Sequence, residues 1–554
     1  MHPFGRLPLF VAALASTAVL ACGGNSTASS TLTVAAATTS LEVACSGESC
    51  GATSGSTYSG SGVGIWRYRN DSGSSTTTQI SISGVTGGKS AILLFSNGQE
   101  SSATLPSAGA IASVASSAPA PAMPLDEERS EHARDQAHAV HLERERDLAN
   151  GLRLLPSRDG AVPSPRATPD VGAHRTWNDV FESLASPVLY STVARKVCSL
   201  PTGRKAIFWV DPDATSAGNV TEADLAYFQT TFCGTSAGYD LVTDLRGDVW
   251  GGYAANWPTV LIQDSGSALQ DVNIVFLNVP SSTGWGGYFT SYNNFLHGYT
   301  SVDGTSFDHS NESLAFFINA PGVKSNRGYY SSTLLHELTH MTDFYQRTVK
   351  HNAPYDTWLT EMAAMMTEDA ITPSVTPDHY AKIPDNRIKP LIASGGAVSL
   401  IHWVNLGNAS YAAGGSLGAF LNRRYGLAIY SSMVDCAPTL SGYACVDALI
   451  RERGGAGLDD EYARLGATLY GLLPVAGTPG GYGFPRISTS GLTLAAVDLS
   501  GYASNRPATA TSLGATFAAT THTYQFDTVA AGRTTYARSG VVVPAGVTLV
   551  LVIQ

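Results

Sequence analysis

A histidine pair within an apolar, periodic segment is the feature that most constrains the fold of this chain. Residues 336–340 read His-Glu-Leu-Thr-His. The spacing of the surrounding apolar residues predicts an amphipathic helix, with Ser331 or Ser332 as the residue that caps its start. On that helix His336 and His340 lie one turn apart on the same face. The apolar residues that set the period are Leu334, Leu335, Leu338, Met341 and Phe344.

Two imidazoles at this spacing can bind one zinc ion. Zinc in catalytic sites usually takes three protein ligands and leaves a fourth position to water, so a third ligand is needed. Glu361 is the candidate, because it is the one carboxylate in the apolar segment 358–364. Burial of an unpaired carboxylate is costly, and coordination to a metal removes that cost. The sequence therefore predicts a site for one Zn²⁺ formed by His336, His340 and Glu361.

These two segments together resemble the gluzincin metallopeptidases, which combine H-E-x-x-H with a glutamate from the following helix. More narrowly, HELTHMTDFYQR followed by TWLTEMAAMMTED is similar to the hyicolysin family, an exported bacterial group. The resemblance covers roughly residues 205–440. It implies an α+β zincin catalytic domain and a zinc-dependent endopeptidase that acts on protein or peptide substrates.

Zinc chemistry assigns a role to Glu337. Zn²⁺ lowers the pKa of a bound water molecule to about 7. Because Glu337 follows His336 directly on the helix, we expect its carboxylate to take the proton of that water as general base. It would later pass the proton to the leaving amine.

Catalysis also requires a donor for the oxyanion of the tetrahedral intermediate. In aminopeptidase-like gluzincins a tyrosine just before a helix has this role, and the resemblance implies Tyr411 for it here. A buried structural tyrosine is the alternative. His402 and Tyr345 are reserve candidates, since both can donate. Glu368 could orient a ligand histidine, although an exposed charge near the end of its helix is the favoured interpretation.

Two other functions stay open at this stage. The first is a surface adhesin or binding lipoprotein with a non-catalytic zinc site. The second is a zinc aminopeptidase, for which Glu312 would be the candidate anchor of the substrate amine. For the leading hypothesis, the gluzincin resemblance implies an edge strand before the active helix that pairs with an extended peptide. Residues 286–292 have the β-prone composition for this strand, and an ordinary aromatic loop is the alternative.

The start of the chain indicates export. Arg6 precedes an apolar run at residues 7–20, which is too short for a membrane-spanning helix and is typical of a signal peptide. Ala21 followed by Cys22 resembles a bacterial lipoprotein signal, and the resemblance implies lipidation of Cys22 and a membrane contact through that lipid alone. Ordinary cleavage after Ala21 gives a secreted protein instead.

The overall charge argues against a nucleic-acid partner. The chain has 33 Lys and Arg residues against 44 Asp and Glu residues, and its formal net charge is −11. No dense basic cluster is present that could neutralise a row of phosphates. Charged residues make up only 14% of the sequence and glycine is abundant, a composition typical of exported, β-rich proteins.

The cysteines agree with an oxidising compartment. Apart from Cys22, the six cysteines form three sequence-local pairs, and short loops favour neighbour pairing. A zinc–thiolate cluster is the weaker interpretation, because no C-x-x-C spacing occurs. The candidate disulfide cysteines are Cys45 with Cys50, Cys198 with Cys233, and Cys436 with Cys445.

Composition divides the chain into six parts. We expect a zincin catalytic domain flanked by small β-sandwich-like domains, because alternating or apolar β-type runs lie on both sides of a mixed α/β region. Within that region, apolar runs at 207–210, 272–279 and 314–318 predict strands buried on both faces. The charged segment 126–147 is interpreted as a helical linker, with a cleavable pro-segment or hinge as the alternative. The predicted boundaries are 1–22 (signal peptide), 23–40 (Ser/Thr-rich tether), 41–110 (β domain), 111–172 (linker), 173–474 (zinc peptidase) and 475–554 (C-terminal β domain).

Overall fold

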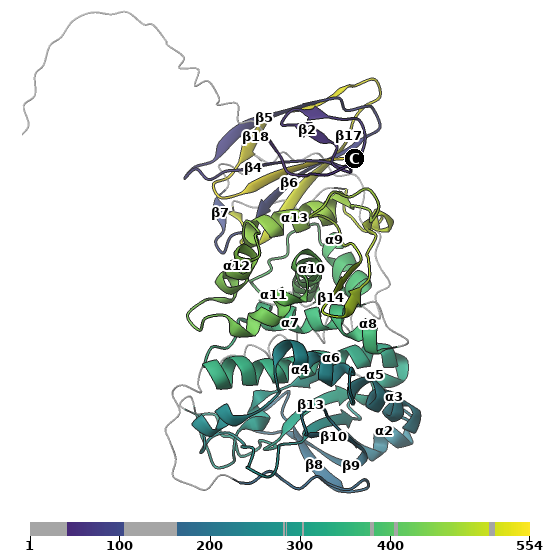
Figure 1. The fold of residues 1–554 in the computed structure, drawn as a ribbon, viewed down its shortest axis with the longest axis vertical. Helices are drawn as coiled ribbons and strands as arrows, with labels where there is room; N and C mark the ends of the chain where they lie inside the picture. Colours follow the sequence, from purple (N-terminus) through teal and green to yellow (C-terminus); the bar gives the residue numbers. More distant parts are fainter. Residues whose placement is uncertain are drawn as a thin grey trace, which may run out of the picture. The chain divides into compact units, whose positions relative to one another are not determined.

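The computed structural model describes residues 41–104, 163–280, 283, 285–301, 304–376, 382–403, 408–508 and 516–554 (Figure 1). The predicted signal peptide with Cys22, the tether and the charged segment 126–147 lie outside these residues. Within the described ranges, no helix combines the length and the apolar character that crossing a membrane requires.

A six-stranded mixed sheet supports the part of the chain that contains the HELTH segment. Its three central strands, β10, β11 and β13, are parallel, and their apolar runs are buried as the sequence predicted. The remaining strands are antiparallel to their neighbours, and β12 forms one edge. In sheet order the strands are β12 (Gly287–Phe289), β13 (Leu314–Asn319), β11 (Val272–Leu277), β10 (Lys205–Val210), β9 (Val188–Ser199) and β8 (His174–Asp179).

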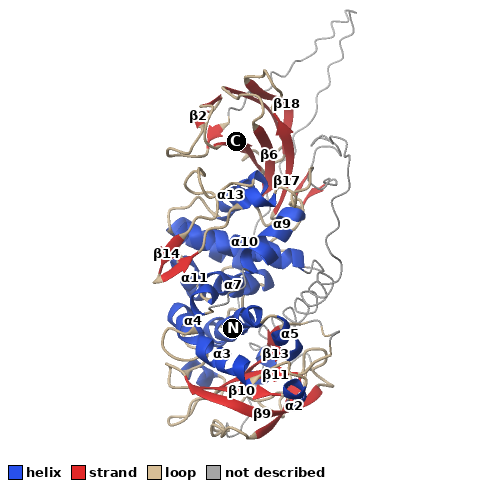
Figure 2. Ribbon diagram, turned by 90° about the vertical axis from the view of Figure 1, so that its right-hand side faces the viewer, coloured by secondary structure: helices blue, strands red, loops and turns tan. Residues whose placement is uncertain are grey.

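Helices cover one face of this sheet (Figure 2). The central helix is α6, which packs on β12, β13 and α4 and continues into a π-helical turn, Phe344–Val349. Its N-cap is Asn326, whose side chain accepts from the backbone N–H of Tyr329 at 3.0 Å. The prediction of a cap at Ser331 or Ser332 was wrong, because the helix begins one turn earlier, where the chain leaves α5. These helices are α2 (Pro212–Ser216), α3 (Glu222–Phe232), α4 (Gly238–Arg246), α5 (Ala320–Ser325) and α6 (Arg327–Asp343).

A second group of helices follows α6 and packs around α10. Glycines on α10 allow a close approach to α7: a Cβ added at Gly418 would lie 2.6 Å from Cγ of Met366. The buried ion pair between Asp369 on α7 and Arg423 on α10, at 2.8 Å, holds the same two helices. The helices are α7 (Thr357–Ala370), α8 (Thr372–Val375), α9 (Lys389–Ala393), α10 (Asn408–Tyr425), α11 (Leu427–Ser432), α12 (Gly442–Glu452) and α13 (Leu458–Gly471).

Strands from both ends of the chain form one β-sandwich. In its five-stranded sheet, the C-terminal strand β19 lies between the N-terminal strands β4 and β6, antiparallel to both (Figure 1). The four-stranded sheet likewise pairs β18 with β5. The first sheet contains β1 (Glu42–Val43), β4 (Gly64–Arg69), β19 (Thr548–Ile553), β6 (Ser90–Asn97) and β17 (Thr521–Thr528); the second contains β18 (Thr535–Val543), β5 (Thr76–Ser83), β3 (Thr57–Tyr58) and β2 (Ala52–Ser54).

The sandwich corrects the expectation of two separate β domains at 41–110 and 475–554. All six residues of β19 are buried, so this strand needs neighbours on both edges and cover on both faces. Leu549 and Leu551 face the second sheet, whereas Val550 and Val552 pack in the same core as α13. Neither β segment could bury its strands alone, and residues 38–554 accordingly form one compact unit.

The three predicted disulfides are present. The Cα–Cα distances are 5.5 Å for Cys45–Cys50, 6.5 Å for Cys198–Cys233 and 5.7 Å for Cys436–Cys445. Each bridge closes a short stretch of chain, so neighbour pairing was the correct choice among the possible connectivities.

The shared sandwich predicts that residues 41–104 stay attached after cleavage of the following linker. A protease site is placed within residues 105–162 and cut in the native protein. We expect both fragments to elute together in size-exclusion chromatography and to separate in denaturant, because none of the three disulfides joins them. Elution of the N-terminal fragment by itself under native conditions would contradict the shared sheet.

A buried histidine at the junction of β17 and α13 predicts sensitivity to acid. The ring of His522 stacks on Tyr462 at 4.2 Å, and neither of its nitrogens has a hydrogen-bond partner among the described residues. Burial lowers the pKa of His522 to about 3. The unfolded chain, with an ordinary pKa of about 6.5, therefore takes up a proton as the pH falls below this value, while the folded chain does not.

The stability that the neutral ring of His522 contributes is thus fully present above about pH 6.5. It is lost progressively as the pH falls towards 3. From pH 7 to pH 5 we expect this ring to lower the free energy of unfolding by about 2 kcal/mol. Urea denaturation of the wild type and of His522→Phe at both pH values measures the effect. An equal pH-dependent loss in the two proteins would rule it out.

Candidate metal centre

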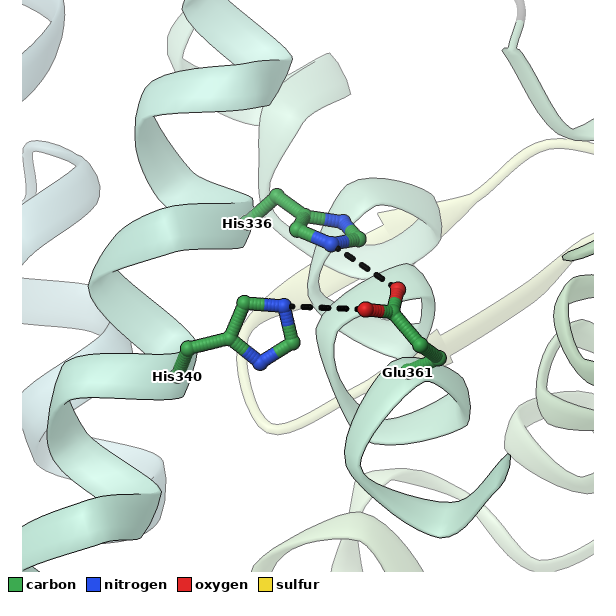
Figure 3. Close-up of side chains that lie close together, drawn as sticks. All are labelled: His336, His340 and Glu361. Atoms are coloured by element: carbon green, nitrogen blue, oxygen red, sulfur yellow. Dashed lines mark ion pairs between the residues drawn. The ribbon is translucent and has the colours of Figure 1, made fainter. Parts of the chain in front are cut away.

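The structure brings His336, His340 and Glu361 together between α6 and α7. Nε2 of His336 lies 3.1 Å from one carboxylate oxygen of Glu361, and Nε2 of His340 lies 3.3 Å from the other (Figure 3). One candidate ligand atom from each residue falls within 4.8 Å of the others. The helical period places both imidazoles on one face of α6, and the α6–α7 packing supplies the carboxylate that they face.

The charge of this group fits a divalent cation. The side chains of His336, His340 and Glu361 are 7%, 3% and 0% exposed. Burial lowers the pKa of His336, but the carboxylates of Glu361 and Glu368 more than offset this and raise the pKa to about 10. The site thus attracts positive charge strongly. Two imidazole nitrogens and a carboxylate oxygen are a donor set of catalytic zinc sites, so these residues fit Zn²⁺.

Glu337 points between this group and the edge strand. Its side chain is buried, and its carboxylate accepts from the backbone N–H of Phe289 on β12. For its other oxygen, Oε2, no hydrogen-bond partner exists within the described part of the chain. Burial raises the pKa of Glu337. A buried carboxylate of this kind can accept a proton from a small molecule bound beside it.

The predicted edge strand lies beside the same helix. β12 pairs with β13 and forms the edge of the sheet, as expected for residues 286–292, although the strand ends at Phe289 and Ser291–Asn294 forms a 3₁₀ turn. The approach to α6 is close, since a Cβ added at Gly287 would lie 2.7 Å from Cγ2 of Thr333.

Comparison with known proteins adds a decisive observation. Residues 189–554 match the family model of peptidase M30, a range that includes every residue of the metal centre. The chain belongs to the peptidase M30 family. Residues 43–109 match a domain of unknown function, DUF8571, and no curated protein matches the chain. Membership makes this protein a peptidase of a metallopeptidase family, a hydrolase that acts on protein or peptide substrates.

The M30 match also includes the C-terminal strands of the sandwich, whereas the match to DUF8571 covers the N-terminal ones. The two matched regions therefore share the sheets described above. This arrangement agrees with a single folded unit for residues 38–554.

Glu368 is buried beside the histidine pair of this M30 peptidase. Its Oε1 lies 3.1 Å from Nδ1 of His336 and 2.7 Å from Nζ of Lys382. The interpretation of Glu368 as an exposed helix-end charge was therefore wrong, and the alternative contact with a ligand histidine is the one observed. Lys382 and Arg387, which both approach Glu368, were missed, because no periodicity in the sequence links them to α7.

A chain of hydroxyl groups fixes the spacing of α6 and α7. Oγ1 of Thr339 on α6 lies 2.8 Å from Oγ1 of Thr367 on α7, which in turn contacts the hydroxyl of Tyr430 on α11. One turn further along, Asp343 accepts from the buried guanidinium of Arg246 at 2.8 Å. The threonine contact holds the helix of the histidines against the helix of the glutamate, and the Arg246–Asp343 pair holds α6 against α4.

The other candidate residues lie in different surroundings. Tyr411 is buried, and its ring packs on Trp403 at 4.9 Å. The hydroxyl of Tyr345 accepts from the backbone N–H of Tyr253 at 3.3 Å. His402 is an exposed residue after α9. Glu312 accepts from the backbone N–H of His297, ahead of the first residue of β13, and pairs with Arg166.

The hydroxyl chain predicts unequal costs for two similar substitutions. Thr367→Val removes a buried hydroxyl that contacts two others, whereas Thr342→Val removes one that bonds only to the carbonyl of its own helix, at Leu338. We expect a loss of about 1–3 kcal/mol in the free energy of unfolding for the first and less than about 1 kcal/mol for the second. Chemical denaturation of both variants measures this difference. Equal losses of stability would show that the hydroxyl chain does not stabilise the packing of α6 on α7.

Proposed function

We propose that this M30 peptidase is an exported, zinc-dependent endopeptidase. The observation that carries the proposal is the position of Glu337, a buried carboxylate with an orphaned oxygen beside two imidazoles and a glutamate. A site that only bound metal for structural reasons would not require this extra carboxylate. The combination supports hydrolysis by activated water.

In this mechanism His336, His340 and Glu361 hold the metal. Bound Zn²⁺ supplies Lewis-acid activation of a water molecule and of the scissile carbonyl. Glu337 accepts the proton from that water and delivers it to the amine that leaves. The backbone N–H of Phe289 holds the carboxylate of Glu337, and Oε2 is the oxygen left to accept the proton.

The edge strand β12 is the proposed binding element for the substrate backbone. A peptide that pairs with β12 runs past α6 and so passes Glu337, which already accepts from the backbone of Phe289. Main-chain pairing holds an extended segment whatever its side chains, which suits cleavage within a polypeptide.

We also propose Tyr411 as the donor to the oxyanion. Two contacts support it: Arg423 of α10 pairs with Asp369 near the end of α7, and Gly414 lies against Met362, the neighbour of the glutamate ligand. The two helices therefore run in the same direction. Tyr411, one turn before Gly414, therefore lies beside the first half of α7, which contains Glu361.

The alternatives receive less support. An aminopeptidase needs a free acidic group to bind the substrate amine, and the candidate Glu312 instead interacts with His297 and Arg166. An adhesin or binding lipoprotein with a non-catalytic zinc site would leave both the peptidase family and the position of Glu337 unexplained.

Export and anchoring are part of the proposal. The three disulfides support an oxidising compartment. We propose that lipidation of Cys22 ties the enzyme to the outer side of a membrane, with secretion after cleavage at Ala21 as the alternative. Incorporation of a labelled fatty acid into the wild type but not into Cys22→Ala distinguishes these two fates.

Casein cleavage by the full chain tests the function. We expect Glu337→Gln to retain one zinc ion per chain and to lose about 10²–10⁴-fold in kcat/KM, because the general base is removed and the ligands are kept. Glu312→Gln is the matched control. It makes the same substitution at a carboxylate just before β13, outside the metal centre, and this variant should cleave casein as the wild type does. A peptide with a blocked N-terminus should be cut as well, which an aminopeptidase would not do.

Metal content separates the possible failures. Unchanged activity in Glu337→Gln would refute the assigned base. A wild-type protein that binds no zinc, or Glu361→Gln that binds it as tightly as the wild type, would refute the metal site itself.

A further inference from the structure

The segment after α8 brings two cations to the buried carboxylate of Glu368. Lys382 is 4% exposed at its side chain, and Nζ lies 2.7 Å from Oε1 of Glu368. Arg387, one turn of π-helix further (Ile383–Ile388), places a guanidinium nitrogen 3.7 Å from Oε2. Each carboxylate oxygen thus has its own cation.

Glu368 contacts the candidate metal centre through His336. Its Oε1, the oxygen that contacts Lys382, also lies 3.1 Å from Nδ1 of His336. The outer nitrogen of a metal-binding histidine usually donates to such a carboxylate, which fixes the ring orientation and directs the other nitrogen at the metal. Here Nε2 of His336 points at Glu361.

The surroundings of Lys382 leave its ammonium little freedom. Nζ also lies 3.4 Å from Oγ1 of Thr333, one turn before Glu337 on α6, and 4.0 Å from the ring centre of Tyr329. Lys382 therefore bridges α6 and α7 on the side of the histidine pair. A side chain held at three points fixes the position of the carboxylate that it touches.

Arg387 is held in a comparable way. Its guanidinium lies over the ring of Tyr411 at 5.4 Å, and Gly415 of α10 provides the space for its stem. A Cβ added at Gly415 would lie 2.7 Å from Cγ of Arg387. The residue proposed as oxyanion donor and the carboxylate behind His336 thus contact the same arginine.

Charge explains why two cations are present. Glu337, Glu361 and Glu368 place three carboxylates in a volume almost closed to solvent. Apart from the histidines, the cations that form ion pairs with this group among the described residues are Lys382 and Arg387. Like charges that close together repel strongly in a low-dielectric interior, so Glu368 needs fixed partners to keep its place.

We propose that Lys382 and Arg387 are positioning residues for the metal centre, which hold Glu368 so that it orients His336 for metal binding. The proposal rests on the zinc site proposed above. Lys382 has the larger effect on the position of Glu368. Its Nζ lies 2.7 Å from the carboxylate, against 3.7 Å for the guanidinium of Arg387, and it contacts the oxygen that His336 also touches.

Zinc affinity of the full chain tests this role. The metal is removed with a chelator, and Zn²⁺ is titrated back in competition with a chromophoric chelator. We expect Lys382→Met to weaken zinc binding about 10–100-fold at unchanged stoichiometry, the range found when partners of ligating histidines are removed. Arg387→Met should lose less, and Lys382→Arg should recover most of the affinity.

Arg423→Met is the matched control. Arg423 pairs with Asp369, the residue after Glu368, in an equally buried ion pair that points to α10 and away from His336. This variant should lose stability but should bind zinc within about twofold of the wild type. At saturating zinc, Lys382→Met should lower kcat with little change in KM, a split that general destabilisation does not produce.

Two results would overturn the proposal: wild-type zinc affinity in Lys382→Met, or an equal loss of affinity in Arg423→Met. If Lys382→Met does not fold, Arg387→Met and Lys382→Arg are measured instead. Wild-type zinc affinity in Arg387→Met, together with no recovery of zinc affinity in Lys382→Arg, would then overturn the proposal. These failures differ from failure of the proposed function, in which the wild type binds no zinc or Glu337→Gln keeps its activity.

Discussion

Three carboxylates buried between α6 and α7 set the conditions that the surrounding structure must meet. Glu361 faces both imidazoles, Glu337 accepts from the edge strand, and Glu368 lies behind His336 with two cations. Each has partners of a different kind, which is why three like charges can share one interior. The group that Glu361 forms with the two imidazoles has the donor set that fits a divalent cation.

The scaffold meets these conditions by close packing of helices. Hydroxyl contacts join α6, α7 and α11, and glycines on α10 bring that helix against the methionines of α7. The same face of α10 gives Arg387 its space and carries Tyr411. The packing of these helices therefore positions both the glutamate of the site and the carboxylate behind His336, since Glu361 and Glu368 both lie on α7.

Local sequence patterns predicted much of the fold and of the candidate metal centre. The period of the HELTH segment and the isolated glutamate in an apolar helix predicted which side chains would meet, and the apolar runs at 207–210, 272–279 and 314–318 matched β10, β11 and β13. Short cysteine spacings predicted the disulfides. What local patterns could not supply was pairing across distance. Lys382 reaches Glu368 through tertiary packing, and the strands of the sandwich are separated by most of the chain, so neither leaves a periodic signal.

The place of β19 has a consequence for the order in which the protein can form. Residues 64–69 and 90–97 are among the first described parts of the chain to be synthesised, yet the strand that belongs between them is the last, Thr548–Ile553. Until that strand arrives, two apolar edges have no partner, and such long-range pairing is slow. A chain that stops before residue 548 leaves those edges exposed, so β4 and β6 are fully paired only once residues 548–553 are present.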